Sequence, residues 1–120
     1  VTIITTAKGL MRKVEALKPE LEKLKKKGVK IRVAAPITKE SLAAAEDISS
    51  VAEVRNISKI NARVAIIDGQ EMMFMVMDDS DVHPSYDIGI WVNTPYFASA
   101  LESLFEIAWN DLQPYNKVKI

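Results

Sequence analysis

Two short runs rich in β-branched residues enclose a long helix-like segment, and this order constrains the fold more than any other feature of the sequence. The runs cover residues 1–6 and 29–35. Between them, apolar residues recur at steps of three or four, which places them on one helical face: Leu10, Val14, Leu17, Leu21 and Leu24. Strand, helix and strand in this order form a βαβ unit with parallel strands and a right-handed crossover. Pro19 interrupts the helix and predicts either a kink or a restart of the helix there, and Gly28 is a natural stop.

The remaining residues predict one short helix, four more strands and a final amphipathic helix. Thr38 can cap a short helix through residues 43–45, and a brief strand follows at 53–57. Two apolar runs, 62–67 and 71–78, are joined through Asp68-Gly69, a strong hairpin signal. A last strand covers 87–92, and Thr94-Pro95 can start a helix whose apolar stripe ends before Pro114. That stripe consists of Phe97, Leu101, Leu104, Phe105, Ala108, Trp109 and Leu112.

This order predicts a single α/β domain over residues 1–114, a mixed sheet sandwiched by helices, followed by a C-terminal tail at 115–120. The chain has 120 residues, enough for a substantial core. It has no cysteine, which excludes disulfides and thiolate chemistry. The longest apolar run, 72–77, is too short to span a membrane, and no signal peptide is visible. We therefore expect a cytoplasmic protein with no membrane partner.

The net charge of zero hides two opposite biases along the chain. Residues 8–32 carry ten Lys or Arg against three acids, whereas residues 64–111 carry nine acids and no Lys or Arg. A basic segment can mark a nucleic-acid face, but this helix has no aromatic residue and its charges surround an apolar stripe. An exposed lysine-rich helix explains it more simply, so we do not expect this segment to read DNA.

Metal, cofactor and hydrolase signatures are missing from the sequence. His83 is the only histidine, and Asp78, Asp79 and Asp81 lack the glycine and final glutamate of a calcium loop. The four glycines are dispersed, so no phosphate-binding loop is formed, and no Gly-x-Ser-x-Gly is present. We therefore expect neither a metal nor a cofactor, and we read the acids at 78–81 as a solvated loop.

One short motif does carry chemical information. Asn61-Ala62-Arg63, four further residues and Asp68 resemble the His-x-Lys-x(4)-Asp motif of the phospholipase D superfamily. On a strand, Asn61 and Arg63 would project to the same face. Asparagine cannot replace the nucleophilic histidine, and the family's Gly-Ser-x-x-Asn is also missing downstream. The site therefore resembles a catalytic one converted to binding or to structure, with Asn61, Arg63 and Asp68 as ligand-binding candidates. Arg55 is a further candidate for lining the same cleft.

Each of these candidates also has a structural explanation. Arg63 can form an ion pair with a nearby acid, Asn61 can simply start a strand, and Asp68 suits the turn. Arg55 can serve at the surface or at an interface. The methionine-rich strand at 72–77 is explained by burial or by an adaptable surface. Trp91 can be a core anchor or a surface on which a ligand stacks.

The whole chain resembles the C-terminal, phospholipase-D-like domain of archaeal TrmB-like transcriptional regulators. Residues 5–6 with 9–10, 28–33, 53–55, 63–69, 89–91 and 104–109 carry the resemblance. It implies a winged-helix DNA-binding domain upstream, so DNA would be contacted only through that domain. It also implies a homodimer in which two motif strands meet about a two-fold axis, and a possible small-molecule effector such as a sugar.

We therefore expect a non-enzymatic effector-sensing or dimerisation domain of a transcription regulator. A ligand would favour one arrangement of the dimer and so position the DNA-binding domains. One alternative is a phospholipase-D-superfamily phosphodiesterase or nuclease half-site. Another is a purely structural dimerisation module without a ligand.

Overall fold

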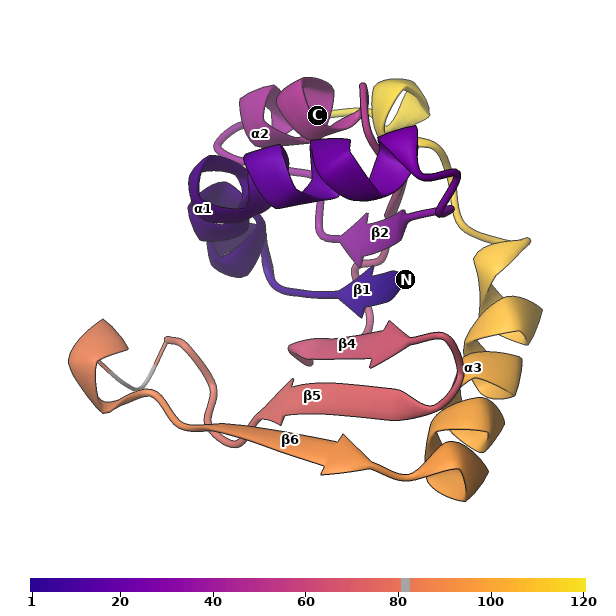
Figure 1. Cartoon of the computed structure of the whole chain (residues 1–120). Helices are drawn as coiled ribbons and strands as arrows, with labels where there is room; N and C mark the ends of the chain where they lie inside the picture. The colour runs from indigo at the N-terminus through magenta and orange to yellow at the C-terminus, as the bar shows by residue number, and fades with distance from the viewer. Residues whose placement is uncertain (81–82) are drawn as a thin grey trace.

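The computed structural model describes residues 1–80 and 83–120 and has the α/β element order predicted from the sequence (Figure 1). The elements are β1 (Thr2–Ile4), α1 (Ala7–Lys26), β2 (Arg32–Ala35), α2 (Leu42–Ile48), β3 (Glu53–Asn56), β4 (Val64–Ile67), β5 (Glu71–Met75), β6 (Gly89–Asn93) and α3 (Pro95–Trp109), with short 3₁₀ turns η1 (Pro84–Tyr86) and η2 (Tyr115–Lys117). None of the helices described is long and apolar enough to cross a membrane.

The six strands form one mixed sheet in the order β3-β2-β1-β4-β5-β6. β1, β2 and β3 run parallel, as the βαβ pattern predicts. β4 pairs antiparallel with β1, and β5 and β6 continue as an antiparallel meander. Figure 1 shows α1 and α2 gathered over the parallel half, while the meander projects away from them.

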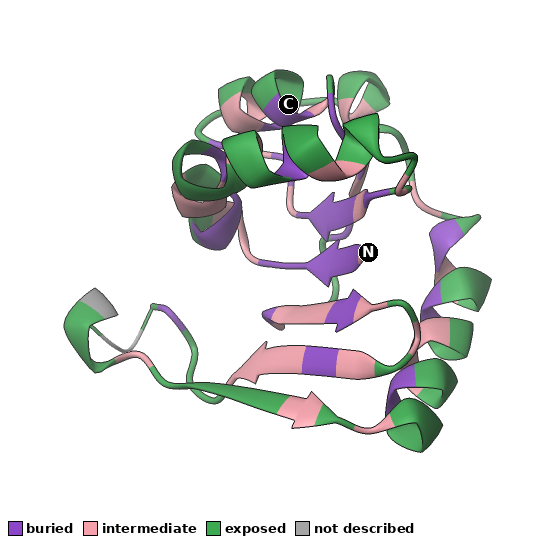
Figure 2. Cartoon of the chain, viewed as in Figure 1, coloured by how far each residue is buried: buried purple, intermediate pink, exposed green. Residues whose placement is uncertain are grey.

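Alternation along the central strands divides the core between the two faces of the sheet. Ile3 and Val33 face α1 and α2 and belong to the larger apolar cluster. Their neighbours Ile4 and Ala34 face the other way and pack with Phe105 of α3. Side chains of successive strand residues point to opposite faces, so the domain has three layers. Figure 2 shows buried residues concentrated in β1 and β2, whereas β6 is largely exposed.

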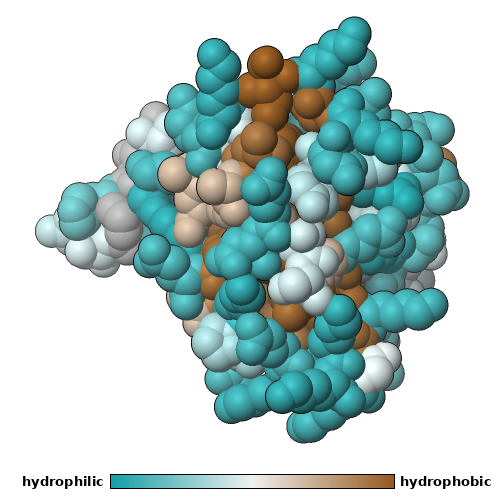
Figure 3. All heavy atoms as spheres, turned by 90° about the horizontal axis from the view of Figure 1, so that it is seen from above, coloured by the Kyte–Doolittle hydropathy of each residue, from teal (hydrophilic) through white to brown (hydrophobic). Residues whose placement is uncertain are grey.

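α1 begins three residues earlier than the apolar pattern indicates, because Thr6 caps it. The Thr6 hydroxyl accepts a hydrogen bond from the Gly9 amide at 2.9 Å. Pro19 lies within the helix, which bends along its length, as the kink prediction requires (Figure 1). Leu17 is exposed rather than part of the core stripe. Seen from the side of α1 and α2, hydrophilic side chains cover most of the surface and flank a central apolar stripe (Figure 3), in agreement with a solvated lysine-rich helix.

The hairpin predicted at Asp68-Gly69 is confirmed. Asp68 and Gly69 have φ angles of 54° and 64° and join β4 to β5, which is the positive-φ pair of a type I′ turn. The strands of the meander are shorter than predicted at their other ends: β4 starts at Val64, β5 stops at Met75 and β6 starts at Gly89. The residues beyond these ends turn their polar side chains toward one another instead.

α2 and the C-terminal segment also differ from expectation. A turn separates Thr38 from α2, and Ser41 occupies the cap position, although the Thr38 hydroxyl still accepts from the Ser41 amide at 3.2 Å. Residues 115–120, predicted to be a tail, contain η2, and Tyr115 and Val118 pack against the larger cluster. This segment is therefore part of the fold.

α3 starts at the predicted Pro95, but its apolar stripe is only partly buried. Phe105 and Trp109 are 5% exposed and face the sheet. Phe97 and Leu104, which the stripe also placed on the core side, are 55% and 64% exposed. Since α3 lies on one face of the sheet, only one side of the helix can be covered. Its apolar residues therefore form two faces, of which the second points to solvent.

Candidate functional site

Arg63 lies immediately before β4 and is buried in a cluster of carboxylates. Its guanidinium donates two hydrogen bonds to Asp87, at 2.5 and 2.9 Å, and a further one to the Met77 carbonyl. Its Nε lies 4.0 Å from Asp79. A planar guanidinium can satisfy a carboxylate with two parallel bonds, so Arg63 ties the segment before β6 to the segment after β5. The ion-pair explanation of Arg63 is thus observed.

Asp79 connects this cluster to the start of α1. It is 4% exposed, and its Oδ2 accepts a hydrogen bond from the Thr6 hydroxyl at 2.5 Å. The same hydroxyl caps α1, so the helix start and the acidic loop share one hydrogen-bond network. The prediction of a solvated loop at 78–81 is wrong for Asp79, because Arg63 and Thr6 compensate its buried charge. Asp81 lies outside the described residues.

Lys13 is a member of the site that sequence reasoning missed. Its ammonium donates to the Thr5 hydroxyl at 3.0 Å. Burial lowers the pKa of this ammonium, and the positive charge of Arg63 lowers it further, against the opposing effect of the carboxylates of Asp79 and Asp87. Lys13 is one of ten basic residues in a lysine-rich segment. No local signal distinguishes it, because its burial depends on the loop folded against α1.

A small hollow of about 150 Å³ adjoins the cluster between the first turns of α1 and the strands β4 and β5. Arg12, Lys13 and Arg63 contribute positive charge to its wall, and Met73 and Met75 contribute apolar surface. Its size suits a single small group such as a phosphate, a carboxylate or part of a sugar. Cationic donors beside an apolar wall can hold such a group and orient it.

The four predicted ligand-binding residues do not come together. Asn61 is exposed, and its Nδ2 donates to Asp78 at 2.8 Å, close in sequence to the Arg63 partners. It precedes β4 rather than lying on a strand with Arg63. Asp68 is an exposed turn residue at the opposite end of β4, roughly 16 Å from Arg63 at the usual rise of a strand. Only Asn61 and Arg63 share one end of the sheet, and ligand binding by any of the four residues remains a prediction.

Arg55 does not line the cleft of Arg63, because it lies on the edge strand β3, which β2 and β1 separate from β4. Its guanidinium lies 4.5 Å from the centre of the Trp109 ring and donates to the Trp109 carbonyl at 2.6 Å. A further bond joins it to Glu53 at 2.9 Å. The role supported by these contacts is attachment of α3 to the sheet.

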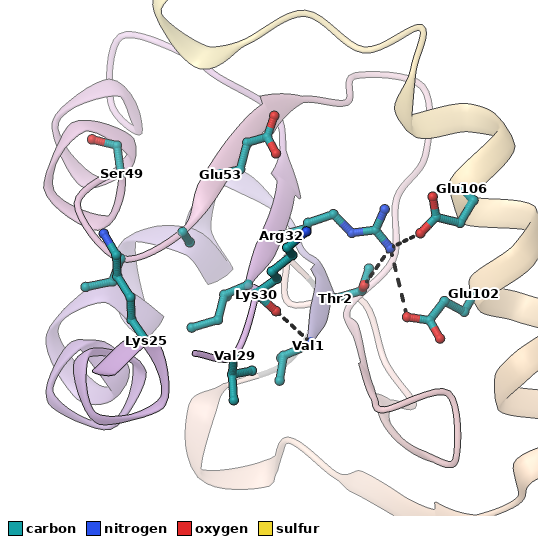
Figure 4. Close-up of a pocket in the computed structure, with 13 residues that line it drawn as sticks. Val1, Thr2, Lys25, Val29, Lys30, Arg32, Ser49, Glu53, Glu102 and Glu106 are labelled. Carbon is teal, nitrogen blue, oxygen red and sulfur yellow. Dashed lines mark hydrogen bonds and ion pairs between the residues drawn. The ribbon is translucent and has the colours of Figure 1, made fainter. Parts of the chain in front are cut away.

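A larger hollow of about 870 Å³ lies at the amino ends of β1 and β2 (Figure 4). Arg32 points across it, donating to the Thr2 hydroxyl at 3.1 Å and pairing with Glu106 at 2.7 Å and Glu102 at 3.9 Å. Lys25 lies on the opposite wall. Its volume is within the range of small-molecule pockets, but its charged groups mainly join β1 and β2 to α3.

Trp91 and the methionines divide between core and surface. Met72 is buried, whereas Met77 is 43% exposed. Trp91 is 57% exposed, and its indole N–H donates to Glu71 at 3.1 Å. It is therefore an exposed residue of β6 rather than a core anchor. No group of three or more histidine or acidic side chains that could hold a metal occurs within residues 1–80 and 83–120.

We predict that Asp87 makes stability sensitive to acid. The hydrogen bond from Arg63 holds the pKa of Asp87 below its ordinary value of 3.8. A carboxyl whose pKa is lower in the folded state contributes stability above its unfolded pKa and loses that contribution as the pH falls through its folded pKa. The stability difference between the natural chain and Asp87→Asn should therefore be largest near neutrality and shrink below about pH 4. Urea unfolding at a series of pH values measures this; a difference that does not change with pH would contradict it.

Comparison with known proteins finds a solved structure that shares the fold of this chain. No family model and no curated protein matches the chain. Among solved structures it is similar to TrmBL2, described as an archaeal chromatin protein that shows a novel mode of DNA binding, with a TM-score of 0.65 and 15% identity. The likeness covers 94% of this chain but 44% of that chain, so this chain spans less than half of the TrmBL2 chain. At this identity the likeness establishes that the chain shares its α/β fold with part of TrmBL2.

Proposed function

We propose that the chain is a non-enzymatic regulatory domain of a TrmB-like transcription regulator, a cytoplasmic protein that contacts DNA through a separate winged-helix domain. The observation that carries the proposal is the fold likeness to TrmBL2 over 94% of the chain. The likeness supports the TrmB-like part of the sequence resemblance, and the phospholipase-D-like character of the domain is part of the proposal. In this domain the roles are self-association and binding of a small effector such as a sugar or a sugar phosphate.

The non-enzymatic character is supported by the chemistry at the motif. Asn61 offers an amide where the superfamily has its nucleophilic imidazole, and an amide is not a usable nucleophile at neutral pH. His83 is exposed, and its Nδ1 accepts from the Ser85 amide. Arg63 already has Asp87 as a bidentate partner, which leaves it poorly suited to hold a substrate phosphate. A phosphodiesterase half-site is therefore the weaker alternative.

Effector binding is best supported at the small hollow beside Lys13 and Arg63. An anionic group entering there would compete with Asp87 for Arg63 and draw on the charges of Arg12 and Lys13. Because Asp79 joins the same cluster to the cap of α1, such an exchange would alter how α1 is held against the meander. A ligand that prefers one of these arrangements shifts their populations.

Ligand-induced thermal stabilisation tests this proposal. The chain is screened with sugars, sugar phosphates, nucleotides and inorganic phosphate, and we expect one class to raise the melting temperature. Lys13→Met should reduce the apparent affinity about tenfold or more, because it removes one charge-assisted contact. Lys23→Met, a change of equal charge at an exposed position of α1, should leave the affinity unchanged.

Three outcomes would count against parts of the proposal. Uniform absence of stabilisation would reject effector sensing and leave a structural dimerisation module. Equal loss in both lysine variants would place the ligand elsewhere on α1. Cleavage of an activated phosphodiester by the purified chain, with or without divalent metal, would restore the enzyme alternative.

A further inference from the structure

The solvent side of α3 is an uncharged apolar surface on a helix whose other side already packs against the sheet. The most exposed large side chains on it are Tyr96 at 90%, Phe97 at 55%, Leu104 at 64% and Ile107 at 73%. Figure 2 shows the outer side of α3 exposed along its length. Exposed helices of globular domains normally place charged and polar residues on this side. We therefore expect a partner to cover the apolar side of α3.

The charged residues of α3 do not belong to this outer side. Glu102 and Glu106 are its only acids, and both pair with Arg32 at the sheet. The residues between the exposed apolar side chains are small or uncharged, among them Ser99, Ala100 and Ser103. Glu106 keeps 57% of its side chain exposed on the flank of the helix, so a partner that contacts only the seam residues would not have to desolvate a charge.

The spacing of the outer residues is that of a coiled-coil seam. Phe97, Ala100, Leu104 and Ile107 follow one another at steps of three, four and three, the a and d positions of a heptad. The buried residues Ala98, Phe105 and Trp109 occupy heptad positions on the opposite side of the helix. The helix therefore presents one complete seam to a second helix.

This seam is complementary to itself when two copies run antiparallel. Phe97 of one copy then meets Ile107 of the other, and Ala100 meets Leu104. The two central layers each pair Ala100 with Leu104, a small residue with a large one. The two outer layers each pair Phe97 with Ile107, two large residues. The centre of this register falls at residue 102, so the two copies of Ser103 lie one position from the axis and close to each other, where no like charges meet. Isologous contacts of this kind generate closed two-fold dimers.

The exposed apolar area approaches the lower limit for a specific dimer. At about 200 Å² for a large side chain, the four exposed residues leave on the order of 550 Å² of apolar surface per copy. This value is near the upper end for a monomer, whose largest patch is about 300–600 Å². Complete burial of these side chains in two copies, including Tyr96 beside the seam, would remove at most roughly 1,100 Å² from solvent, close to the lower limit of about 1,200 Å² for specific interfaces, and Ala100 and Ser103 add to it.

We propose that two copies of the chain associate through antiparallel packing of α3 about a two-fold axis between Ala100 and Leu104. This inference specifies the surface used for the self-association in the proposed function, and it rests on that part of the proposed function. It does not require that the domain binds an effector. It also names a different face from the motif strand that the family resemblance puts at the axis. The dimer seam lies on the outer layer, away from Asn61 and Arg63.

Sedimentation velocity over a wide concentration range tests the interface. We expect the natural chain to dimerise, and Leu104→Glu to raise the dissociation constant at least about 100-fold, because each dimer would bury two new charges at its centre. Trp91→Glu is the matched control, an equal change at an exposed apolar residue of β6. Its dissociation constant should stay within about threefold of that of the natural chain. Circular dichroism establishes that both variants are folded.

Cross-linking gives a second measurement that does not depend on a disruptive variant. The chain has no cysteine, so a single cysteine at position 103 or 99 is a specific probe. A short bis-maleimide should join two copies of Ser103→Cys, which lie beside the axis, far more efficiently than two copies of Ser99→Cys, which lie on the flank.

The outcomes separate the interface from self-association itself. A dimer weakened by Trp91→Glu but not by Leu104→Glu would overturn the α3 interface while leaving self-association intact. A natural chain that stays monomeric at all concentrations would overturn both. Cross-linking of Ser99→Cys in preference to Ser103→Cys would overturn the antiparallel register.

Discussion

Trp109→Ala is expected to lower the free energy of unfolding by about 3–5 kcal/mol, the usual cost of removing a buried tryptophan. Trp109 is 5% exposed, and its ring lies under the guanidinium groups of Arg32 at 5.4 Å and Arg55 at 4.5 Å. The substitution leaves a cavity in the smaller apolar cluster and removes both cation–π contacts. Urea unfolding followed by circular dichroism measures the change.

Ser99→Ala is the matched control for Trp109→Ala. It lies on the same helix at an exposed position outside the proposed seam and should change stability by less than about 0.5 kcal/mol. A loss below about 1 kcal/mol in Trp109→Ala would mean that α3 contributes little to the stability of the sheet. Such a result would also contradict the assignment of Arg55 to the attachment of α3.

Arg63→Met is expected to lower the free energy of unfolding by about 3 kcal/mol, because it leaves buried carboxylates without their cation. The variant keeps an apolar side chain of similar length but removes the partner of Asp87 and the nearby charge that compensates Asp79. Thermal unfolding should show a decrease in melting temperature of roughly 10 °C or more. Lys59→Met, the same charge change at an exposed residue a few positions earlier, should have little effect.

A double-mutant cycle distinguishes an ion pair from a general packing effect. If Arg63 and Asp87 act as a unit, Arg63→Met combined with Asp87→Asn should destabilise less than the sum of the two single substitutions. Strict additivity would show that the two side chains do not stabilise each other in solution. This result bears on function, since an arginine already committed to Asp87 must exchange partners to bind an effector.

The element order and the start of the sheet could be predicted from local sequence. The strand–helix–strand pattern of the first 35 residues predicts the parallel pairing of β1 with β2, which is observed. Asp68-Gly69 predicts the hairpin because both residues tolerate positive φ. These signals depend on a few neighbouring residues, so they can be read from the sequence without knowledge of the tertiary structure.

The candidate site could be predicted only in part. The motif directed attention to Arg63, which is at the centre of the charged cluster. It did not predict Lys13, Asp79 or Thr6, which lie up to 73 positions apart in the sequence and meet through folding. It grouped Arg63 with Asp68, although the length of β4 separates them. Arg55, the further candidate, lies on β3, and β2 and β1 stand between β3 and β4. Spacing along the chain does not determine distance when strands and turns intervene.

The sequence by itself determined the alternation of strands and helices, the place of the hairpin and the opposite charge of the two halves. Only the tertiary structure decided which apolar face of α3 is buried, because both faces have helical spacing and one sheet can cover only one of them. It likewise decided which acids are solvated and which compensate Arg63. The physical reason is the same in both cases. Periodicity and turn chemistry are local, whereas burial and charge pairing depend on segments that come together only in the folded chain.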